Sequence, residues 1–233
     1  MFFPLFDTEN SRYERKFVVN DMMLPQIRQQ VRIHQAAFST IFYPRFINNI
    51  YLDNRELDFY FDNVSGCGSR KKVRIRWYGN LFGEIEKPVL EFKIREGFLG
   101  NKLSFPLTSF SLDENITSSH LQEIFTRSKI PQWTKNILKH LHPSLINRYQ
   151  REYFLSFDKQ FRLTIDTELN YYGIAANNNT LLEHYTSQDI IVELKYDYKN
   201  FIKAPDISTL LPFRLTKNSK YVNGIDLLHP LLA

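Results

Sequence analysis

Residues 72–79 read Lys72-Val73-Arg74-Ile75-Arg76-Trp77-Tyr78-Gly79, an alternation of basic and apolar side chains that ends in a turn signal. Successive side chains of a β-strand point to opposite faces of its sheet, so this spacing predicts a strand with one entirely basic face. Val73, Ile75 and Trp77 form the opposite, apolar face. Such a strand needs a core on one side and surroundings suited to clustered positive charge on the other.

The same alternation recurs in residues 12–17, 90–95, 161–166 and 190–195. Their charged faces carry Arg12, Glu14 and Lys16; Glu91, Lys93 and Arg95; Arg162, Thr164 and Asp166; and Glu193 and Lys195. One such strand is typical of a sheet with one face in water. The repetition, with arginines whose like charges repel, instead favours a sheet that closes into a barrel and binds an anion inside.

The order of the predicted elements favours an α+β fold. Strands are predicted at residues 12–19, 46–53, 72–78, 89–96, 100–107, 152–157, 161–166 and 190–196, and helices at 24–38, 119–129 and 133–141, with a last helical stretch over 207–228 interrupted by a loop at Ser219-Lys220. Helices follow runs of strands, which indicates a large antiparallel sheet rather than a doubly wound parallel one. No repeat or linker is apparent, so we expect a single domain over residues 1–233.

The composition narrows the class of protein. The 233 residues are 43% hydrophobic, which is enough for a core, and Cys67 is the single cysteine, which excludes an internal disulfide. The sequence has neither a secretory leader nor an apolar run of the roughly 20 residues that cross a bilayer, so we expect a cytoplasmic protein. A net charge of +5 permits an anionic ligand without indicating nucleic acid.

The charged faces suit a linear polyphosphate or a nucleoside triphosphate bound with a divalent metal. The planar fork of arginine matches phosphate oxygens with two parallel hydrogen bonds, and lysine adds a compact charge. The acids among them would repel phosphate and so need another role. Holding Mg²⁺ or Mn²⁺, which prefer oxygen ligands and bridge phosphate oxygens, is one such role, and pairing with neighbouring cations is the other.

Six segments, in this order, resemble the VTC domain, the polyphosphate polymerase domain of the vacuolar transporter chaperone family, within the CYTH-like or triphosphate tunnel metalloenzyme superfamily. They are residues 12–17, 72–79, 90–93, 161–167, 192–196 and 219–221. The resemblance implies an antiparallel eight-stranded β-barrel tunnel and metal-dependent transfer of the ATP γ-phosphate to a growing polyphosphate chain. The sequence lacks the SPX domain and membrane spans of the eukaryotic members, so it resembles the compact bacterial form.

The resemblance and the charged faces together assign candidate roles. Catalytic, phosphate-neutralising roles fall to Lys16, Arg74, Arg76, Lys93 and Arg162; substrate binding to Arg12, Arg151, Lys195, Lys217 and Lys220; and the Mg²⁺ or Mn²⁺ ion to Glu193, with Glu14 and Glu91. Many tunnel triphosphatases begin with Glu-x-Glu-x-Lys, whereas Arg12 stands here in place of the first acid. This departure weakens the case for a two-metal hydrolase.

Three alternatives remain open at this point. Water as the acceptor would make the same site an inorganic tri- or polyphosphatase or a nucleoside triphosphatase. A non-catalytic module could bind polyphosphate or nucleic acid, but Trp77 and Phe92 fall on the apolar face rather than among the charges, so no nucleic acid is expected. A purely structural barrel would leave the basic excess unexplained.

Overall fold

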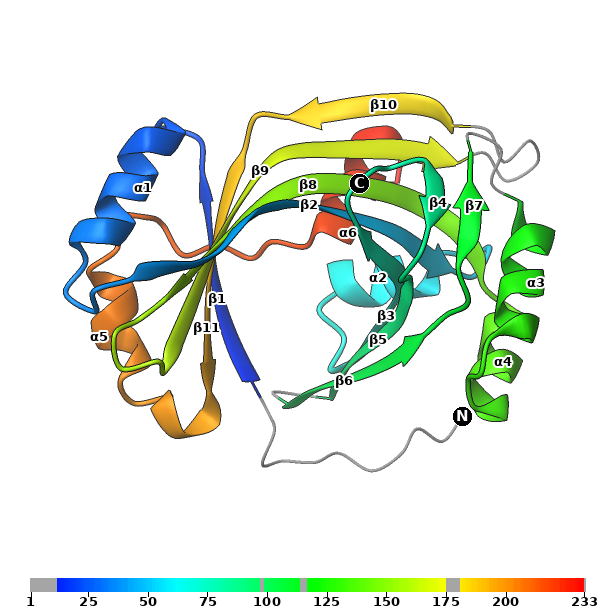
Figure 1. The fold of residues 1–233 in the computed structure, drawn as a ribbon, viewed down its shortest axis with the longest axis horizontal. Helices are drawn as coiled ribbons and strands as arrows, with labels where there is room; N and C mark the ends of the chain where they lie inside the picture. The colour runs from blue at the N-terminus through cyan, green and yellow to red at the C-terminus, as the bar shows by residue number, and fades with distance from the viewer. Residues whose placement is uncertain (1–11, 97–98, 114–116, 175–180, 233) are drawn as a thin grey trace.

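The computed structural model describes residues 12–96, 99–113, 117–174 and 181–232, and a nine-stranded antiparallel sheet dominates it (Figure 1). The main path of the sheet runs β1 (Arg12–Val19), β11 (Ile190–Asp197), β9 (Phe161–Ile174), β8 (His142–Leu155), β2 (Ser39–Asp53), β3 (Ser69–Tyr78), β5 (Val89–Glu96) and β6 (Leu99–Pro106), and β10 (Leu181–Ser187) pairs with β9. A small second sheet joins β4 (Gly83–Ile85) to β7 (Phe110–Leu112). The antiparallel α+β class predicted from the sequence is confirmed.

The predicted division of each strand into an apolar and a charged face is present in the sheet. On β3, Val73, Ile75 and Trp77 are at most 2% exposed and belong to the core. Arg74 and Arg76 lie on the opposite, inner face and contact acids there. The alternation of residue types along this strand therefore separates the side chains of the core from those of the inner face.

The sheet curls so that its two ends approach each other. Lys93 of β5 donates a hydrogen bond to Glu14 of β1 across 2.5 Å, although these strands lie near opposite ends of the strand order. Within the described ranges no ladder joins β1 to β6, so backbone closure of the expected barrel is not observed. The edge of β1 is instead covered by the segment before the last helix, where Thr216 N–H donates to the carbonyl of Lys16.

Two helical layers cover the outer face of the curled sheet (Figure 1). Helices α1 (Leu24–Ile33) and α5 (Ala204–Thr209) pack near β1, β9 and β11, and α3 (Ser118–Arg127) and α4 (Gln132–Leu138) pack near β3 and β5. A 3₁₀ turn, η1 (Tyr198–Asn200), follows β11. The first helix ends earlier than the sequence predicts, because His34 leaves the helical conformation and Ala37 has a φ of 47°.

The C-terminal helix α6 (Lys220–Leu228) packs inside the curl. Its Tyr221 and Ile225 share a core with Leu145 and Tyr171 of β8 and β9. Gly224 permits this approach, since a Cβ atom there would lie 2.5 Å from Leu145 Cδ2 and 2.7 Å from Tyr171 Cδ1. Apolar side chains therefore fill one end of the interior and leave the charged part beside it.

Asp53 anchors α6 to the sheet and to α2 (Asp58–Val64). The Tyr221 hydroxyl donates to Asp53 Oδ2 at 2.6 Å, and backbone N–H groups of Phe59 and Tyr60 donate to the same carboxylate. Ser219 caps the helix by accepting a bond from Val222 N–H. The helical stretch predicted over 207–228 is wrong in its first part, because α5 ends at Thr209 and the non-helical segment reaches Ser219, which leaves Lys220 as the first residue of α6. This anchoring fixes where Lys220 enters the interior.

Candidate functional site

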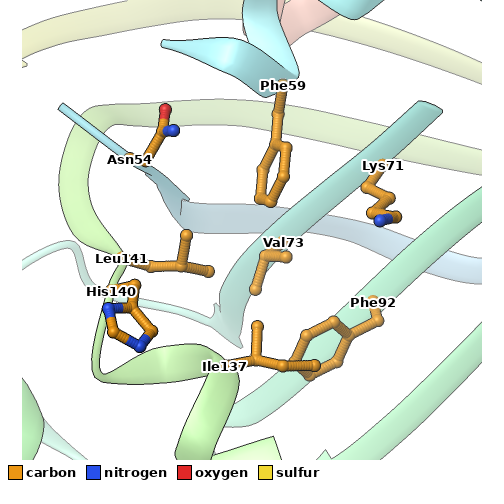
Figure 2. Close-up of a pocket in the computed structure, with 8 residues that line it drawn as sticks. All are labelled: Asn54, Phe59, Lys71, Val73, Phe92, Ile137, His140 and Leu141. Atoms are coloured by element: carbon orange, nitrogen blue, oxygen red, sulfur yellow. The ribbon is translucent and has the colours of Figure 1, made fainter. Parts of the chain in front are cut away.

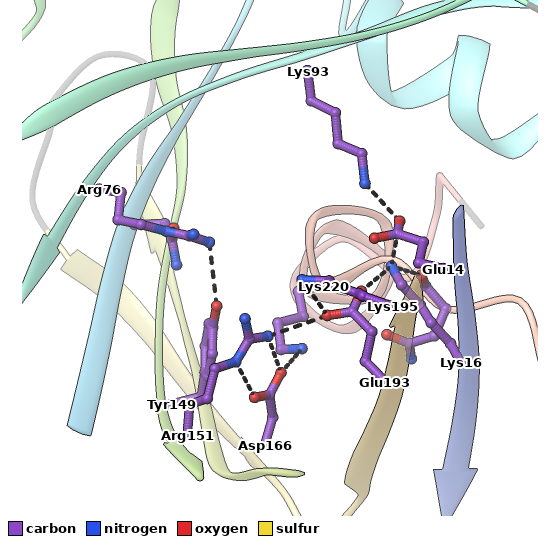
Figure 3. A network of polar contacts seen from close by, with 12 residues as sticks. Glu14, Lys16, Arg76, Lys93, Tyr149, Arg151, Asp166, Glu193, Lys195 and Lys220 are labelled. Carbon is purple, nitrogen blue, oxygen red and sulfur yellow. Dashed lines mark hydrogen bonds and ion pairs between the residues drawn. The ribbon is translucent and has the colours of Figure 1, made fainter. Parts of the chain in front are cut away.

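The inner face gathers charged side chains from distant parts of the chain into one network (Figure 3). Glu193 of β11 lies in it, 6% exposed, with its carboxylate 2.9 Å from Lys195 Nζ, 3.5 Å from Arg151 Nη2 and 3.6 Å from Lys16 Nζ. Burial and the neighbouring cations act in opposite directions on its pKa. The cations prevail and hold the pKa of Glu193 well below its usual value, so the carboxylate is ionised.

Asp166, which is fully buried, contacts Arg151 and Lys220 in this network. Arg151 donates from Nε and Nη2 to the two oxygens of Asp166 at 2.5 and 2.6 Å, and Lys220 Nζ donates to the same carboxylate at 2.5 Å. Burial opposes the ionisation of Asp166, but the charges of Arg151 and Lys220 outweigh it and lower its pKa. Asp166 thus fixes the positions of both cations.

Glu14 connects the two ends of the sheet. Its carboxylate lies 2.5 Å from Lys93 Nζ and 3.5 Å from Lys16 Nζ. Burial and the nearby Glu193 raise the pKa of Glu14, whereas Lys93 and Lys16 lower it by more, so the net shift is downward. Lys16 therefore lies between two ionised carboxylates.

A second cluster surrounds Glu91 of β5. Arg74 Nη2 lies 2.6 Å and Arg76 Nη1 3.7 Å from Glu91 Oε2, and Lys102 of β6 contacts the other oxygen. Burial raises the pKa of Glu91, but the two arginines and Lys102 overcome it and lower the pKa to about 2. Arg76 also donates to the Tyr149 hydroxyl at 3.3 Å, which links this cluster to the first.

Burial and neighbouring like charges disfavour the charged form of two lysines of the inner face, Lys72 and Lys93. Burial, together with the charges of Lys16 and Lys93, lowers the pKa of Lys72 well below its usual value, and burial lowers the pKa of Lys93. Lys72 Nζ donates to Ser219 Oγ at 2.8 Å, a neutral partner. An anion bound here would relieve this repulsion.

The structure brings most of the predicted site together but not all of it. Lys16, Arg74, Arg76, Lys93, Arg151, Lys195 and Lys220 reach the inner network with Glu14, Glu91 and Glu193. Arg162 is exposed beside the network, and Lys217 is exposed on the segment that precedes α6. Arg12 begins β1 opposite Asp197, and its side chain lies outside the described residues.

Lys102 and Tyr149 join the network although the sequence analysis did not select them. Lys102 pairs in register with Lys93, so the alternation of residues 100–107 carries a weak signal for it. Tyr149 lies in a segment that is not predicted as a strand, so no alternation of residue types indicates its inward orientation.

The carboxylates predicted to hold a metal separate into two places. Glu14 and Glu193 both contact Lys16, whereas Glu91 belongs to the cluster around Arg74. Among the residues that the structure describes, no three acidic, histidine or cysteine side chains meet in a metal-binding group. Mg²⁺ is usually held by one or two carboxylates together with water and phosphate oxygens. The ionised pair Glu14 and Glu193 fits that arrangement.

A separate apolar cavity of about 240 Å³ lies on the outer side of the sheet (Figure 2). Val73 and Phe92 contribute to it from β3 and β5, together with Phe59, Ile137 and Leu141. Because Val73 and Phe92 belong to the face opposite the charges, this cavity is not part of the charged network.

None of the helices in the described ranges is long and apolar enough to cross a bilayer.

The family model of the VTC domain matches residues 11–229. Subunit 4 of the vacuolar transporter chaperone complex of Schizosaccharomyces pombe is 25% identical over 147 residues, which cover 53% of this chain and 20% of that protein. The chain thus aligns with about a fifth of the length of this relative.

Solved structures share the fold at low sequence identity. A putative adenylyl cyclase from Hippeastrum, described as having a dominant triphosphatase activity, superposes with a TM-score of 0.51 at 14% identity, covering 91% of this chain and 93% of that one. A putative adenylate cyclase from Vibrio parahaemolyticus gives a TM-score of 0.50 at 10% identity, covering 91% and 97%. These likenesses concern the fold alone.

Proposed function

The chain belongs to the VTC domain family, and we propose that it is a metal-dependent polyphosphate polymerase that transfers the γ-phosphate of ATP to a growing polyphosphate chain. The observation that supports this most strongly is the excess of cations over acids on the inner face. The cations are Lys16, Lys72, Arg74, Arg76, Lys93, Lys102, Arg151, Lys195 and Lys220, and the acids are Glu14, Glu91, Asp166 and Glu193.

The cations supply what phosphoryl transfer needs. Charge spreads over the outer oxygens of the transferring group, so catalysis comes mainly from fixed positive charges and from positioning. Arg74 and Arg76 are held by Glu91, and Arg151 and Lys220 by Asp166, before any substrate arrives. Their side chains therefore need little reorganisation when they neutralise a bound triphosphate.

The acceptor in this reaction needs no strong base. A terminal phosphate oxygen is already ionised near neutral pH, because the second pKa of a phosphate is about 6. This agrees with the absence of histidine from the described contacts of the network. Glu193 and Glu14 would hold a Mg²⁺ or Mn²⁺ ion, which would supply positive charge against the charge of the phosphates.

Hydrolysis is the second candidate. The structurally similar protein from Hippeastrum is described as a triphosphatase, and water could replace the phosphate acceptor in the same network. The two reactions differ in whether the interior holds a chain end or water at the acceptor position. Residues that bind the donor phosphates serve both reactions, so their substitution does not separate them.

Product analysis separates the candidates, and variants test the site. We expect purified protein with ATP and Mn²⁺ or Mg²⁺ to yield long polyphosphate on a gel together with an equivalent amount of ADP. Arg74→Ala and Glu193→Ala should each reduce kcat/KM by at least about a hundredfold, the scale seen when one group that stabilises transition-state charge is removed. Lys129→Ala, exposed between α3 and α4, is the matched control. Full activity of Arg74→Ala would contradict the proposed role.

A further inference from the structure

A cavity of about 290 Å³ adjoins the charged network on the side where β8, β9 and β11 present Tyr153, Thr164 and Lys195. Arg151, which donates two hydrogen bonds to Asp166 in the network, also lines this cavity, as do Phe42 and Arg162. Thr164 pairs in register with Glu193. The cavity therefore shares Arg151 and Lys195 with the network in which we place the phosphates.

A cluster of Phe42, Arg45, Tyr78 and Tyr153, called the aromatic rim here, reaches this cavity through Phe42 and Tyr153, which line it. The Arg45 guanidinium lies 5.1 Å from the ring centre of Phe42, 5.0 Å from Tyr78 and 4.8 Å from Tyr153. Phe42 and Tyr78 are 53% and 52% exposed. Half-exposed rings and a guanidinium plane are the surfaces on which proteins stack nucleobases.

Two hydroxyl groups between the rim and the phosphates lack partners. Thr164 is 6% exposed, and in the described part of the chain neither its Oγ1 nor the Tyr153 Oη has a hydrogen-bond partner. These residues are paired in register on β8 and β9. A buried hydroxyl without a partner destabilises the folded protein, so two adjacent ones in residues that line a cavity point to a ligand that satisfies them.

We propose that this cavity is the nucleoside subsite of the donor nucleotide. The base stacks on the aromatic rim, the sugar bonds to Tyr153 and Thr164, and the triphosphate enters the charged network beyond them. The order of rim, hydroxyls and cations matches the order of base, sugar and phosphates. Both hydroxyls are covered in the free protein, and rotation about the Cα–Cβ bond of Thr164 exchanges Oγ1 with Cγ2 and turns the hydroxyl toward the ligand.

This inference rests on the proposed function. Comparing the binding of two ligands distinguishes a failure of the inference from a failure of the proposed function. Calorimetry in Mg²⁺ buffer measures the affinity of ATP and of inorganic triphosphate, which has no nucleoside. Phe42→Ala should weaken ATP binding about tenfold, as expected for one lost base stack, and leave triphosphate affinity within about twofold. Tyr153→Phe should act in the same direction, with Tyr185→Phe on β10 as the matched control. Intact triphosphate binding also reports that each variant is folded.

Thr164→Val provides a readout that a structural role would not give. Removing an unpaired buried hydroxyl should raise the Tm by about 2–4 °C while ATP binding weakens and triphosphate binding is unchanged. Equal loss of both ligands in Phe42→Ala, or no change in either, would overturn the nucleoside subsite. Wild-type protein that binds neither ligand would overturn the proposed function, and the subsite with it.

Discussion

Replacement of Glu91 by glutamine tests whether this acid holds arginines or holds a metal. The side chain is 6% exposed and lies among Arg74, Arg76 and Lys102. These cations overcome the effect of burial and lower the pKa of Glu91 from 4.5 to about 2. Since each unit by which the pKa is lowered corresponds to about 1.4 kcal/mol, the ionised carboxylate contributes about 3 kcal/mol to the free energy of unfolding at pH 7.

The pH dependence of this contribution has a definite sign. The folded-state pKa of Glu91 is lower than the unfolded one, so the contribution is complete above pH 4.5 and is lost as the pH falls through about 2. Urea unfolding should show Glu91→Gln to be destabilised by about 3 kcal/mol at pH 7 and by only about 1 kcal/mol at pH 3. The exposed Glu96→Gln, at the end of the same strand, should change stability by less than about 0.5 kcal/mol.

Binding data complete this test. With Glu91 neutral, the three cations around it are less compensated, so inorganic triphosphate should bind more tightly in the absence of metal. Equal stability of Glu91→Gln and Glu96→Gln, together with a weaker response to Mn²⁺ in Glu91→Gln, would refute the reasoning and restore Glu91 as a metal ligand.

Three further predictions concern the inner face. Asp166→Asn leaves Arg151 without its buried partner and should lower the free energy of unfolding by about 3–5 kcal/mol in urea titrations, and an unchanged midpoint would contradict this. Gly224→Ala places a Cβ 2.5 Å from Leu145 Cδ2 and should cost about 1–3 kcal/mol, so a gain in Tm would show that α6 is not tightly packed. Burial and the charges of Lys16 and Lys93 lower the pKa of Lys72 well below its usual value, so triphosphate binding should take up a proton and weaken by up to about tenfold per pH unit as the pH rises through that lowered pKa. Calorimetry in buffers of different ionisation enthalpy measures the uptake, and none in wild type would contradict it.

The alternation of residues made the charged strands predictable. β1 has the bounds predicted for it, and the faces that carry Lys16, Arg74 and Glu193 point where the period of two places them. The short elements α2, β4, β7 and β10 have no strong period and are not predicted by the sequence. The apolar end that α6 fills also had no signal, because its tight contact depends on Gly224 approaching a strand that is distant in the sequence.

Burial on both faces explains why the long strands were predicted too short. The first part of β8, from His142 onward, places buried residues on both faces, so its sequence does not alternate. In β9 the period breaks at Glu168, whose φ of 51° accompanies a register shift against β8. Inner residues are even-numbered up to Asp166 and odd-numbered from Leu169 onward, so the prediction stopped at 166.

The aromatic residues of the inner face could not be predicted for the same reason. Phe42 lies in the part of β2 that precedes the predicted strand, and Tyr153 lies where bulges interrupt the pairing of β2 with β8. The alternation predicts Trp77 and Phe92 on the apolar face, and both lie there in the core. Contacts across bulged strands depend on the register, which a single sequence does not specify.

The fate of the γ-phosphate of ATP tests the central claim most directly. Purified protein is incubated with γ-labelled ATP and Mn²⁺, and the label is followed over time in long polyphosphate and in free phosphate. We predict that most of the label enters chains that lengthen with time, with one ADP formed per phosphate added. Label released as free phosphate from the start, with no chains formed, would contradict the polymerase and make this network the site of a hydrolase.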